Sequence, residues 1–194
     1  MKKYLYLAKP EFASTWVNGG EIPIYPASRY RSMERSGVFT PDENLIHDSP
    51  VDLFSLSPIV SFGPNPNVRN FTFTGNTLNG RPLPNFTNAS LYTEDGIILS
   101  FANEFDLEIA RRLEKKACVE IKSIERLKTL LDRRLGKTSK ARDCEYTNDH
   151  QRNHFLKSTE DAWQKEYRFF WRITEERKVI LPAGLARVVW VDGE

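Results

Sequence analysis

Hydrophobic and polar residues alternate most regularly near the end of the chain, from Trp163 to Trp171. In a strand, side chains two residues apart point to the same face. One face would then carry Trp163, Lys165, Tyr167, Phe169 and Trp171, and the other Gln164, Glu166, Arg168 and Phe170. A helix would spread the aromatic residues over all sides and place Gln164 and Glu166 roughly 200° apart. The pattern therefore predicts a strand over 163–171, with Gln164 and Glu166 side by side on its non-core face.

The remaining patterns predict a mixture of helices and strands. Strands are expected over 3–8, 22–25, 96–102, 117–121, 144–147 and 186–191, and helices over 10–16, 106–116, 123–136 and 150–157. The helix over 123–136 is the clearest, because its leucines form one stripe and Gly136 ends it. Residues 51–90 are rich in Pro, Asn, Thr and Gly, which predicts a long loop with brief β segments. We expect one α+β domain over 1–194, with 51–90 as an excursion from it.

Composition narrows the classes of protein. With 40% hydrophobic and 28% charged residues, the chain is typical of a soluble globular protein. It has no apolar run near the roughly 20 residues that span a bilayer, so no membrane contact is expected and a cytoplasmic location is the default. Cys118 and Cys144 predict neither a disulfide framework nor a zinc site. His150 and His154 have a spacing that can hold a metal on a helix, but a surface pair is favoured and no metal is expected.

Positive charge is concentrated in one stretch. The net charge is only +2, but residues 111–142 contain 12 basic and four acidic residues, a net charge of +8. Such a segment can bind nucleic acid or another polyanion, and a solvated helical face is the alternative. The part of this segment from Arg133 to Arg142 has few compensating acidic residues and ends in a loop-like sequence. The candidates for nucleic-acid contacts are therefore Arg133, Arg134, Lys137 and Lys140.

The Gln164–Glu166 pair has two interpretations. Polar residues that alternate with aromatic ones are typical of any half-solvated strand, and a Gln-x-Glu spacing often arises by chance. A Gln-x-Glu pair on a strand is also the arrangement with which ADP-ribosyltransferases cleave NAD and direct ADP-ribose to an acceptor. The order of the surrounding motifs favours this second interpretation.

The chain resembles a family of short bacterial ADP-ribosyltransferase-fold proteins with toxin-like and phage-defence members. The motifs that carry the resemblance are Leu5-Tyr6, Gly20-Glu21-Ile22, Pro26-Ala27-Ser28-Arg29-Tyr30, Ile98-Leu99-Ser100-Phe101 and Trp163-Gln164-Lys165-Glu166-Tyr167-Arg168. They follow one another in the order typical of that family and span most of the chain, apart from 51–90. The resemblance implies two packed, mainly antiparallel sheets flanked by helices, and an enzyme that uses NAD as a substrate without a metal.

The resemblance also implies a division of roles. Glu166 would bind the nicotinamide-ribose 2′-hydroxyl and stabilise the positive charge that develops as nicotinamide leaves. Gln164 would orient the acceptor beneath the anomeric carbon. Ser100 would brace Glu166 or the ribose. Trp163, with Tyr167 and Phe169, would pack in the core.

The NAD-binding residues beyond Ser100 are less closely defined by the resemblance. Tyr6 or Lys9 occupies the place where the best-known transferases have Arg, and Tyr6 is taken as a contact to NAD. Arg29 or Arg31 would supply the positive charge for the pyrophosphate, because the forked donors of a guanidinium suit phosphate.

The sequence departs from the family in two motifs. Ser100-Phe101-Ala102 keeps only the first serine of Ser-Thr-Ser, and Gln164 stands where many members have Glu. The second change resembles enzymes that modify asparagine or nucleic-acid bases. RNA, DNA and protein all remain open as acceptors, with nucleic acid slightly favoured by the basic segment. An intracellular toxin or defence effector, with an antitoxin or inhibitor protein as partner, is the expected setting; the competing hypothesis is a non-catalytic nucleic-acid- or protein-binding module on the same fold.

Overall fold

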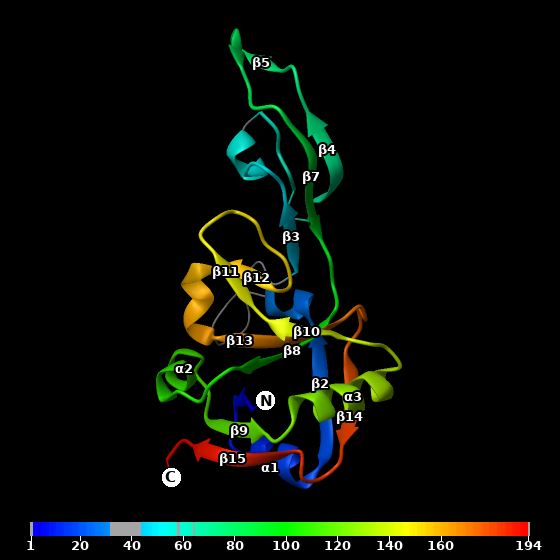
Figure 1. The fold of residues 1–194 in the computed structure, drawn as a ribbon, viewed down its shortest axis with the longest axis vertical. Coiled ribbons are helices and arrows are strands. Elements are labelled where there is room, and N and C mark those ends of the chain that lie inside the picture. The colour runs from blue at the N-terminus through cyan, green and yellow to red at the C-terminus, as the bar shows by residue number, and fades with distance from the viewer. Residues whose placement is uncertain (1, 32–43, 58, 64, 194) are drawn as a thin grey trace.

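The computed structural model describes residues 2–31, 44–57, 59–63 and 65–193, which form a mixed α+β structure with mostly antiparallel strands (Figure 1). The first elements are β1 (Lys3–Leu7), α1 (Glu11–Asn18), β2 (Gly20–Pro26), η1 (Ala27–Arg31), β3 (Leu45–Asp48), η2 (Leu53–Leu56), β4 (Asn67–Phe73), β5 (Thr77–Leu78), β6 (Arg81–Pro82), β7 (Phe86–Thr93) and β8 (Ile97–Ala102). They are followed by α2 (Leu107–Arg112), β9 (Ala117–Ile121), α3 (Ile124–Leu135), β10 (Lys140–Asp143), β11 (Glu145–Thr147), β12 (Leu156–Ser158), η3 (Thr159–Gln164), β13 (Glu166–Trp171), β14 (Arg177–Leu181) and β15 (Ala186–Val191). Elements labelled η are 3₁₀ helices.

Within the described residues, an eight-stranded sheet forms the body of the protein. Its main path runs β10-β13-β8-β1-β9-β15, and β2 pairs with both β8 and β14. These pairs are all antiparallel. β9 is buried along its whole length, as expected of an apolar strand with a neighbour on each side. β10 and β14 have no counterpart among the predicted elements.

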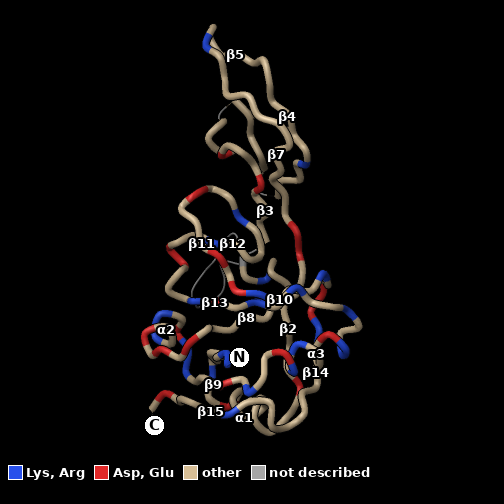
Figure 2. The backbone as a smooth tube through the Cα atoms, in the orientation of Figure 1, with Lys and Arg blue, Asp and Glu red and all other residues tan. Residues whose placement is uncertain are grey.

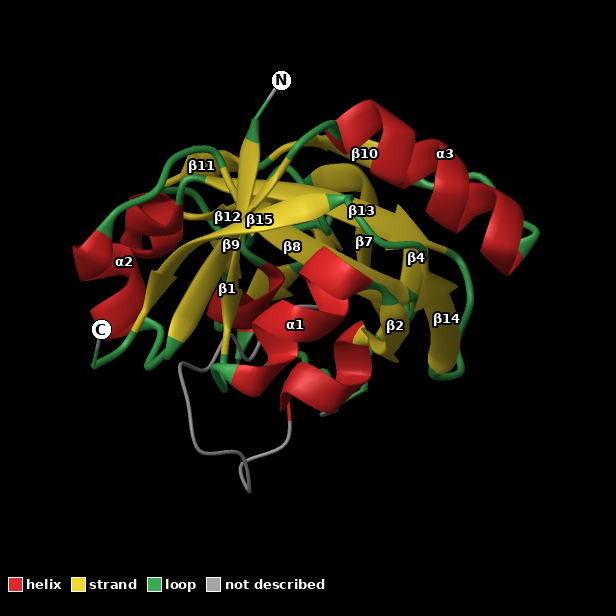
Figure 3. Cartoon of the chain, turned by 90° about the horizontal axis from the view of Figure 1, so that it is seen from below, coloured by secondary structure: helices red, strands yellow, loops and turns green. Residues whose placement is uncertain are grey.

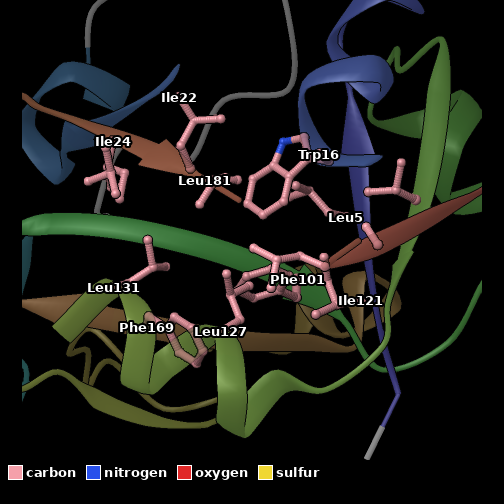
Figure 4. Close-up of a cluster of buried hydrophobic side chains, with 14 of the residues drawn as sticks. Leu5, Trp16, Ile22, Ile24, Phe101, Ile121, Leu127, Leu131, Phe169 and Leu181 are labelled. Carbon is pink, nitrogen blue, oxygen red and sulfur yellow. The ribbon is translucent and has the colours of Figure 1, made fainter. Parts of the chain in front are cut away.

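The main hydrophobic core lies on one face of this sheet, beneath α1, α3 and the β2–β14 ladder (Figure 3). Side chains from all of these elements meet there (Figure 4): Leu5, Trp16, Ile22, Ile24, Phe101, Ile121, Leu127, Leu131, Phe169 and Leu181. β13 contributes Phe169 and Trp171, and Tyr167 packs against the edge of the core. The aromatic face predicted for this strand is therefore the core face from Tyr167 onward.

The helix predicted over 123–136 is α3, and its ends follow the expected chemistry. The Ser123 side chain caps it by accepting a hydrogen bond from Arg126 N, and Gly136 ends it in the left-handed conformation with φ 65°. Asp132 then ties the helix to β13, because its Oδ1 accepts a hydrogen bond of 2.8 Å from Trp171 Nε1. This contact holds α3 over the strand that carries Glu166.

Residues 45–93 are more structured than a long loop. Strands β3, β7 and β4 form a second sheet, which projects from the body together with the β5–β6 hairpin (Figure 1). This extension has its own buried cluster: Leu53, Leu56, Phe86, Ala89 and Leu91. Asn70 and Asn88 have φ of 52° and 57°, and the β4–β7 register shifts along these strands. Such irregularities break the alternation from which strands are predicted. The brief β segments expected over 51–90 are present, but they pair into a sheet with its own core instead of lying in a long loop.

The predicted helix over 150–157 is also wrong. Asp149 Oδ1 accepts a hydrogen bond from His150 N at 2.7 Å, and Asn153 Oδ1 accepts one from Phe155 N at 2.8 Å. Local side-chain bonds of this kind compete with helix formation. His150 and His154 therefore do not share a helix face.

No helix in the described part of the chain is long and apolar enough to cross a membrane.

Candidate active site

Gln164 and Glu166 lie on different elements. β13 begins at Glu166, whereas Gln164 is the last residue of η3. Between them Lys165 takes up a left-handed conformation with φ 45°, which turns the chain from the helix into the strand. The predicted strand over 163–171 is therefore wrong for 163–165, because a 3₁₀ helix capped by the Ser158 side chain precedes the turn.

Trp163 consequently lies outside the core. The Arg112 guanidinium covers its ring, with 3.8 Å from the guanidinium carbon to the ring centroid. This cation–π pair joins η3 to the end of α2. The aromatic side chain therefore connects two elements instead of packing beneath the sheet.

A pocket of about 250 Å³ lies where β1 and β8 separate. These strands pair at Tyr4 and Ala102, and β8 pairs with β2 at Ile97 and Ile98. Between those points, the edge of β8 that faces β1 has no strand partner among the described residues. The pocket is lined by four of the predicted site residues, namely Tyr6, Ser100, Gln164 and Glu166. Side chains from four elements are thus gathered at one opening in the sheet.

Glu166 is the centre of a buried ion cluster. Arg168 holds its carboxylate from one side, with Nε 3.0 Å from Oε1 and Nη2 3.0 Å from Oε2. Lys157 donates to Oε2 at 3.1 Å. Only 6% of Glu166, 2% of Arg168 and 5% of Lys157 is exposed. Glu166 is on the face opposite the main core, as predicted, but that face is covered and not solvated.

The cluster keeps Glu166 ionised. Burial alone would raise the pKa of its carboxyl, but the charges of Arg168 and Lys157 outweigh burial. With a hydrogen bond from the Ser100 side chain, they lower the pKa of Glu166 to about 2. The pocket therefore contains a carboxylate that is negatively charged at neutral pH and held in one orientation.

Tyr6 and Ser100 line the pocket from β1 and β8, which are neighbouring strands. Ser100 lies opposite Arg168 in the β8–β13 register. The Tyr6 hydroxyl accepts a hydrogen bond from Asp106 N at 2.8 Å, and burial raises the pKa of Tyr6 well above its usual value. Tyr6 is therefore a neutral phenol that anchors the start of α2 to β1.

Of the two predicted arginines, the structure describes only the side chain of Arg29, which lies away from the pocket lining. Arg29 forms an ion pair with Glu176 at 2.8 Å and lies over the Tyr25 ring, with 3.7 Å from the guanidinium carbon to the centroid. It does not line the pocket. The side chain of Arg31 is outside the described part of the structure. Among the described lining residues the cation is Lys115, at the end of the turn after α2.

Comparison with protein-family models, curated proteins and solved structures found no match to this chain.

The basic segment is divided in space. Its first part, with Arg111 and Arg112, belongs to α2, and its second part lies on and after α3. These two helices are on opposite sides of the body (Figures 2 and 3). None of the four predicted nucleic-acid contacts lines the pocket: Arg133, Arg134, Lys137 and Lys140. The +8 of the sequence is thus not one continuous surface.

Three residues of the site had no assigned role in the sequence analysis: Lys157, Arg168 and Lys115. Arg168 has a sequence signal, because it lies two residues after Glu166 on the same strand face. Lys157 follows an irregular segment and reaches Glu166 only because β12 and η3 fold over β13. Among the described residues, no cluster of His, Cys, Asp or Glu side chains could hold a metal ion.

Proposed function

We propose that this protein is an NAD-dependent ADP-ribosyltransferase that transfers ADP-ribose to a macromolecular acceptor. The observation that carries the proposal is the pocket between β1 and β8, where Tyr6, Ser100, Gln164 and Glu166 meet. The mixed α+β structure with mostly antiparallel strands is compatible with the ADP-ribosyltransferase-like fold that the resemblance implies. A toxin or defence effector in the cell is the setting that the family resemblance implies.

ADP-ribosyl transfer requires negative charge next to the bond between nicotinamide and the ribose. When nicotinamide leaves NAD, its ribose develops positive charge at the anomeric carbon, and an ionised, rigid carboxylate stabilises that charge. Glu166 meets both conditions, because Arg168 and Lys157 fix its position and keep it charged. Its other role would be to accept a hydrogen bond from the ribose 2′-hydroxyl. Ser100 braces the same carboxylate from β8.

The size of the pocket limits which part of NAD it would hold. At about 250 Å³ it is slightly smaller than pockets that enclose drug-sized ligands, roughly 300–1,000 Å³. It suits the nicotinamide ribose, and the adenosine half would extend beyond it. Lys115 is the lining cation that would contact a phosphate, and this assignment replaces the predicted role of Arg29.

The test is incubation with isotopically labelled NAD and separate pools of protein, DNA and RNA. The wild-type protein should release nicotinamide and label one pool. Glu166→Gln should lower the rate by about 100-fold or more, as loss of one electrostatic contact to a transition state does. Glu120→Gln is the matched control, because Glu120 is also a buried carboxylate but lies on β9 outside the pocket.

The outcomes separate the two classes of function. Absence of nicotinamide release with every pool, together with no thermal shift on addition of NAD, would contradict the proposal and favour a binding module. Equal activity of Glu166→Gln and wild type would contradict the assignment of Glu166.

A further inference from the structure

A buried polar cluster determines which way the Gln164 side-chain amide points. Lys157 Nζ lies 3.0 Å from Gln164 Oε1 and 3.1 Å from Glu166 Oε2. On the other side, Gln164 Nε2 lies 3.0 Å from Asp161 Oδ1. Lys157 lies on β12, whereas Asp161 and Gln164 lie on η3, so the cluster depends on how these two elements fold together.

The identities of the partners leave one amide orientation. An ammonium group has three donors and no acceptor, so it must face the amide oxygen. An ionised carboxylate has only acceptors, so Asp161 must face the amide nitrogen. A rotated amide would place N–H groups against the ammonium and oxygen against the carboxylate, and both contacts would be repulsive. The two partners therefore select the same orientation.

This orientation decides what Gln164 can offer to a molecule in the pocket. Its oxygen is engaged by Lys157, whose positive charge disfavours a second, cationic donor there. One N–H is engaged by Asp161, which leaves the second N–H as a hydrogen-bond donor. A guanidinium group has donors only and cannot pair with that N–H. An acceptor that fits Gln164 therefore has two neighbouring atoms: one whose lone pair accepts the hydrogen bond from this N–H, and one that attacks the anomeric carbon.

Nucleobases and the asparagine carboxamide both have such a pattern, and the neighbouring residues favour the base. Base edges place ring nitrogen or carbonyl acceptors beside amino groups. Gln164 and Leu113 line the pocket, and their chain neighbours Trp163 and Arg112 stack on each other. Arg112 is exposed, and its guanidinium lies over the Trp163 ring. This pair could serve as a stacking surface for a base, because bases stack on guanidinium planes and aromatic rings.

We infer that Lys157 is a positioning residue which orients the Gln164 amide so that the pocket selects a nucleobase as the ADP-ribose acceptor. This inference rests on the proposed function and adds its substrate class. In the reaction, the bond between the anomeric carbon and nicotinamide breaks, and its electron pair leaves with nicotinamide, which becomes neutral. A base nitrogen donates its lone pair to the anomeric carbon and then releases its proton to water.

The test compares transfer with hydrolysis in two variants. The measurements are nicotinamide release into water, the KM for NAD, and ADP-ribose incorporation into single-stranded DNA and RNA oligonucleotides, agmatine and an asparagine-containing peptide. Wild type should label an oligonucleotide in preference to agmatine or the peptide. Lys157→Met should slow both reactions, because Lys157 also holds Glu166. It should in addition lower the ratio of oligonucleotide transfer to hydrolysis by about tenfold or more, since the charge-assisted hydrogen bond to Gln164 is lost.

Two further variants protect the test against loss of folding. Lys3→Met is the matched control, because Lys3 is also buried but bonds to Asn103 and Asp143 away from the amide; its ratio should equal that of wild type. Asp161→Asn removes the second orienting partner at a site where the side chain is 19% exposed. Its ratio should fall by several-fold, and its melting temperature should fall less than that of Lys157→Met, because the Asp161 side chain is partly hydrated.

The results distinguish three kinds of failure. Absence of nicotinamide release by wild type would overturn the proposed function itself. Preferred labelling of agmatine or the peptide by an active wild type would overturn only the nucleobase acceptor. An unchanged ratio in both Lys157→Met and Asp161→Asn would overturn the positioning role.

Discussion

Replacing Glu166 by Gln should markedly lower the melting temperature of the protein. The cluster contains two anions, Glu166 and Asp161, and two cations, Lys157 and Arg168, so its charges balance. Gln at position 166 keeps the volume but leaves two buried cations with one carboxylate. If Glu166 lay on a solvated face, as alternation alone implies, the same substitution would leave stability unchanged.

The magnitude follows from burial. Removing one partner of a buried ion pair costs about 3–5 kcal/mol in the free energy of unfolding. For a protein of 150–250 residues, each kcal/mol lowers the melting temperature by about 2–4 °C. The expected fall for Glu166→Gln is therefore about 6–20 °C. Because native domains are stable by only about 5–15 kcal/mol, activity of this variant must be measured well below its melting temperature.

Glu120→Gln provides the contrast in the same thermal unfolding assay. Glu120 is also buried, but its partners Arg187 and Lys2 are 59% and 63% exposed. Solvent can hydrate those cations once the carboxylate is lost, so this variant should lose no more than about 1 kcal/mol. A fall for Glu166→Gln no larger than that for Glu120→Gln would refute the buried cluster.

The pH dependence gives an independent check. The folded pKa of Glu166 is about 2, below the usual 4.5 that the unfolded chain should show. A carboxyl with a depressed pKa stabilises the folded state fully above the unfolded pKa, and this contribution is lost as pH falls through the folded pKa. The difference in melting temperature between wild type and Glu166→Gln should therefore narrow as pH falls from about 4.5 to about 2. A constant difference across this range would contradict the assigned ionisation.

Three further predictions concern the acceptor, the basic surface and the extension. Gln164→Ala should reduce transfer to the acceptor more than NAD hydrolysis, because water needs no orienting amide; equal loss of both rates would contradict the acceptor role. Neutralising the four basic residues near α3 should lower the slope of log affinity for nucleic acid against log salt by about 0.7–0.9 for each phosphate contact removed, without affecting NAD cleavage; the residues are Arg133, Arg134, Lys137 and Lys140. Burial and then the charge of His150 lower the pKa of His47, so the unfolded chain binds a proton more readily and wild type should lose stability as pH falls below about 6.5. His47→Gln should show a smaller fall in melting temperature between pH 7.5 and 5.5, and a fall equal to that of wild type would exclude His47 as the cause.

The sequence alone determined the elements whose signals are local. β9, α3 and most of β13 could be predicted, because apolar runs, a leucine stripe with Ser123 and Gly136 at its ends, and aromatic alternation each depend on neighbouring residues. Glu166, Gln164 and Ser100 were selected as candidates through the motifs that carry the family resemblance. These patterns report which face a residue occupies, but not what covers that face.

Only the tertiary structure decided the surroundings of Glu166. Lys157 and the segment before it fold over β13 through contacts that no local pattern encodes, and they convert a presumed solvated carboxylate into a buried, paired one. The pocket likewise arises because β1 and β8 pair at one position and then separate, while β2 pairs with the other end of the same edge of β8. Pairing between distant strands depends on packing across the whole sheet, so alternation identified the residues of the site while the fold determined their charge environment and their access to a ligand.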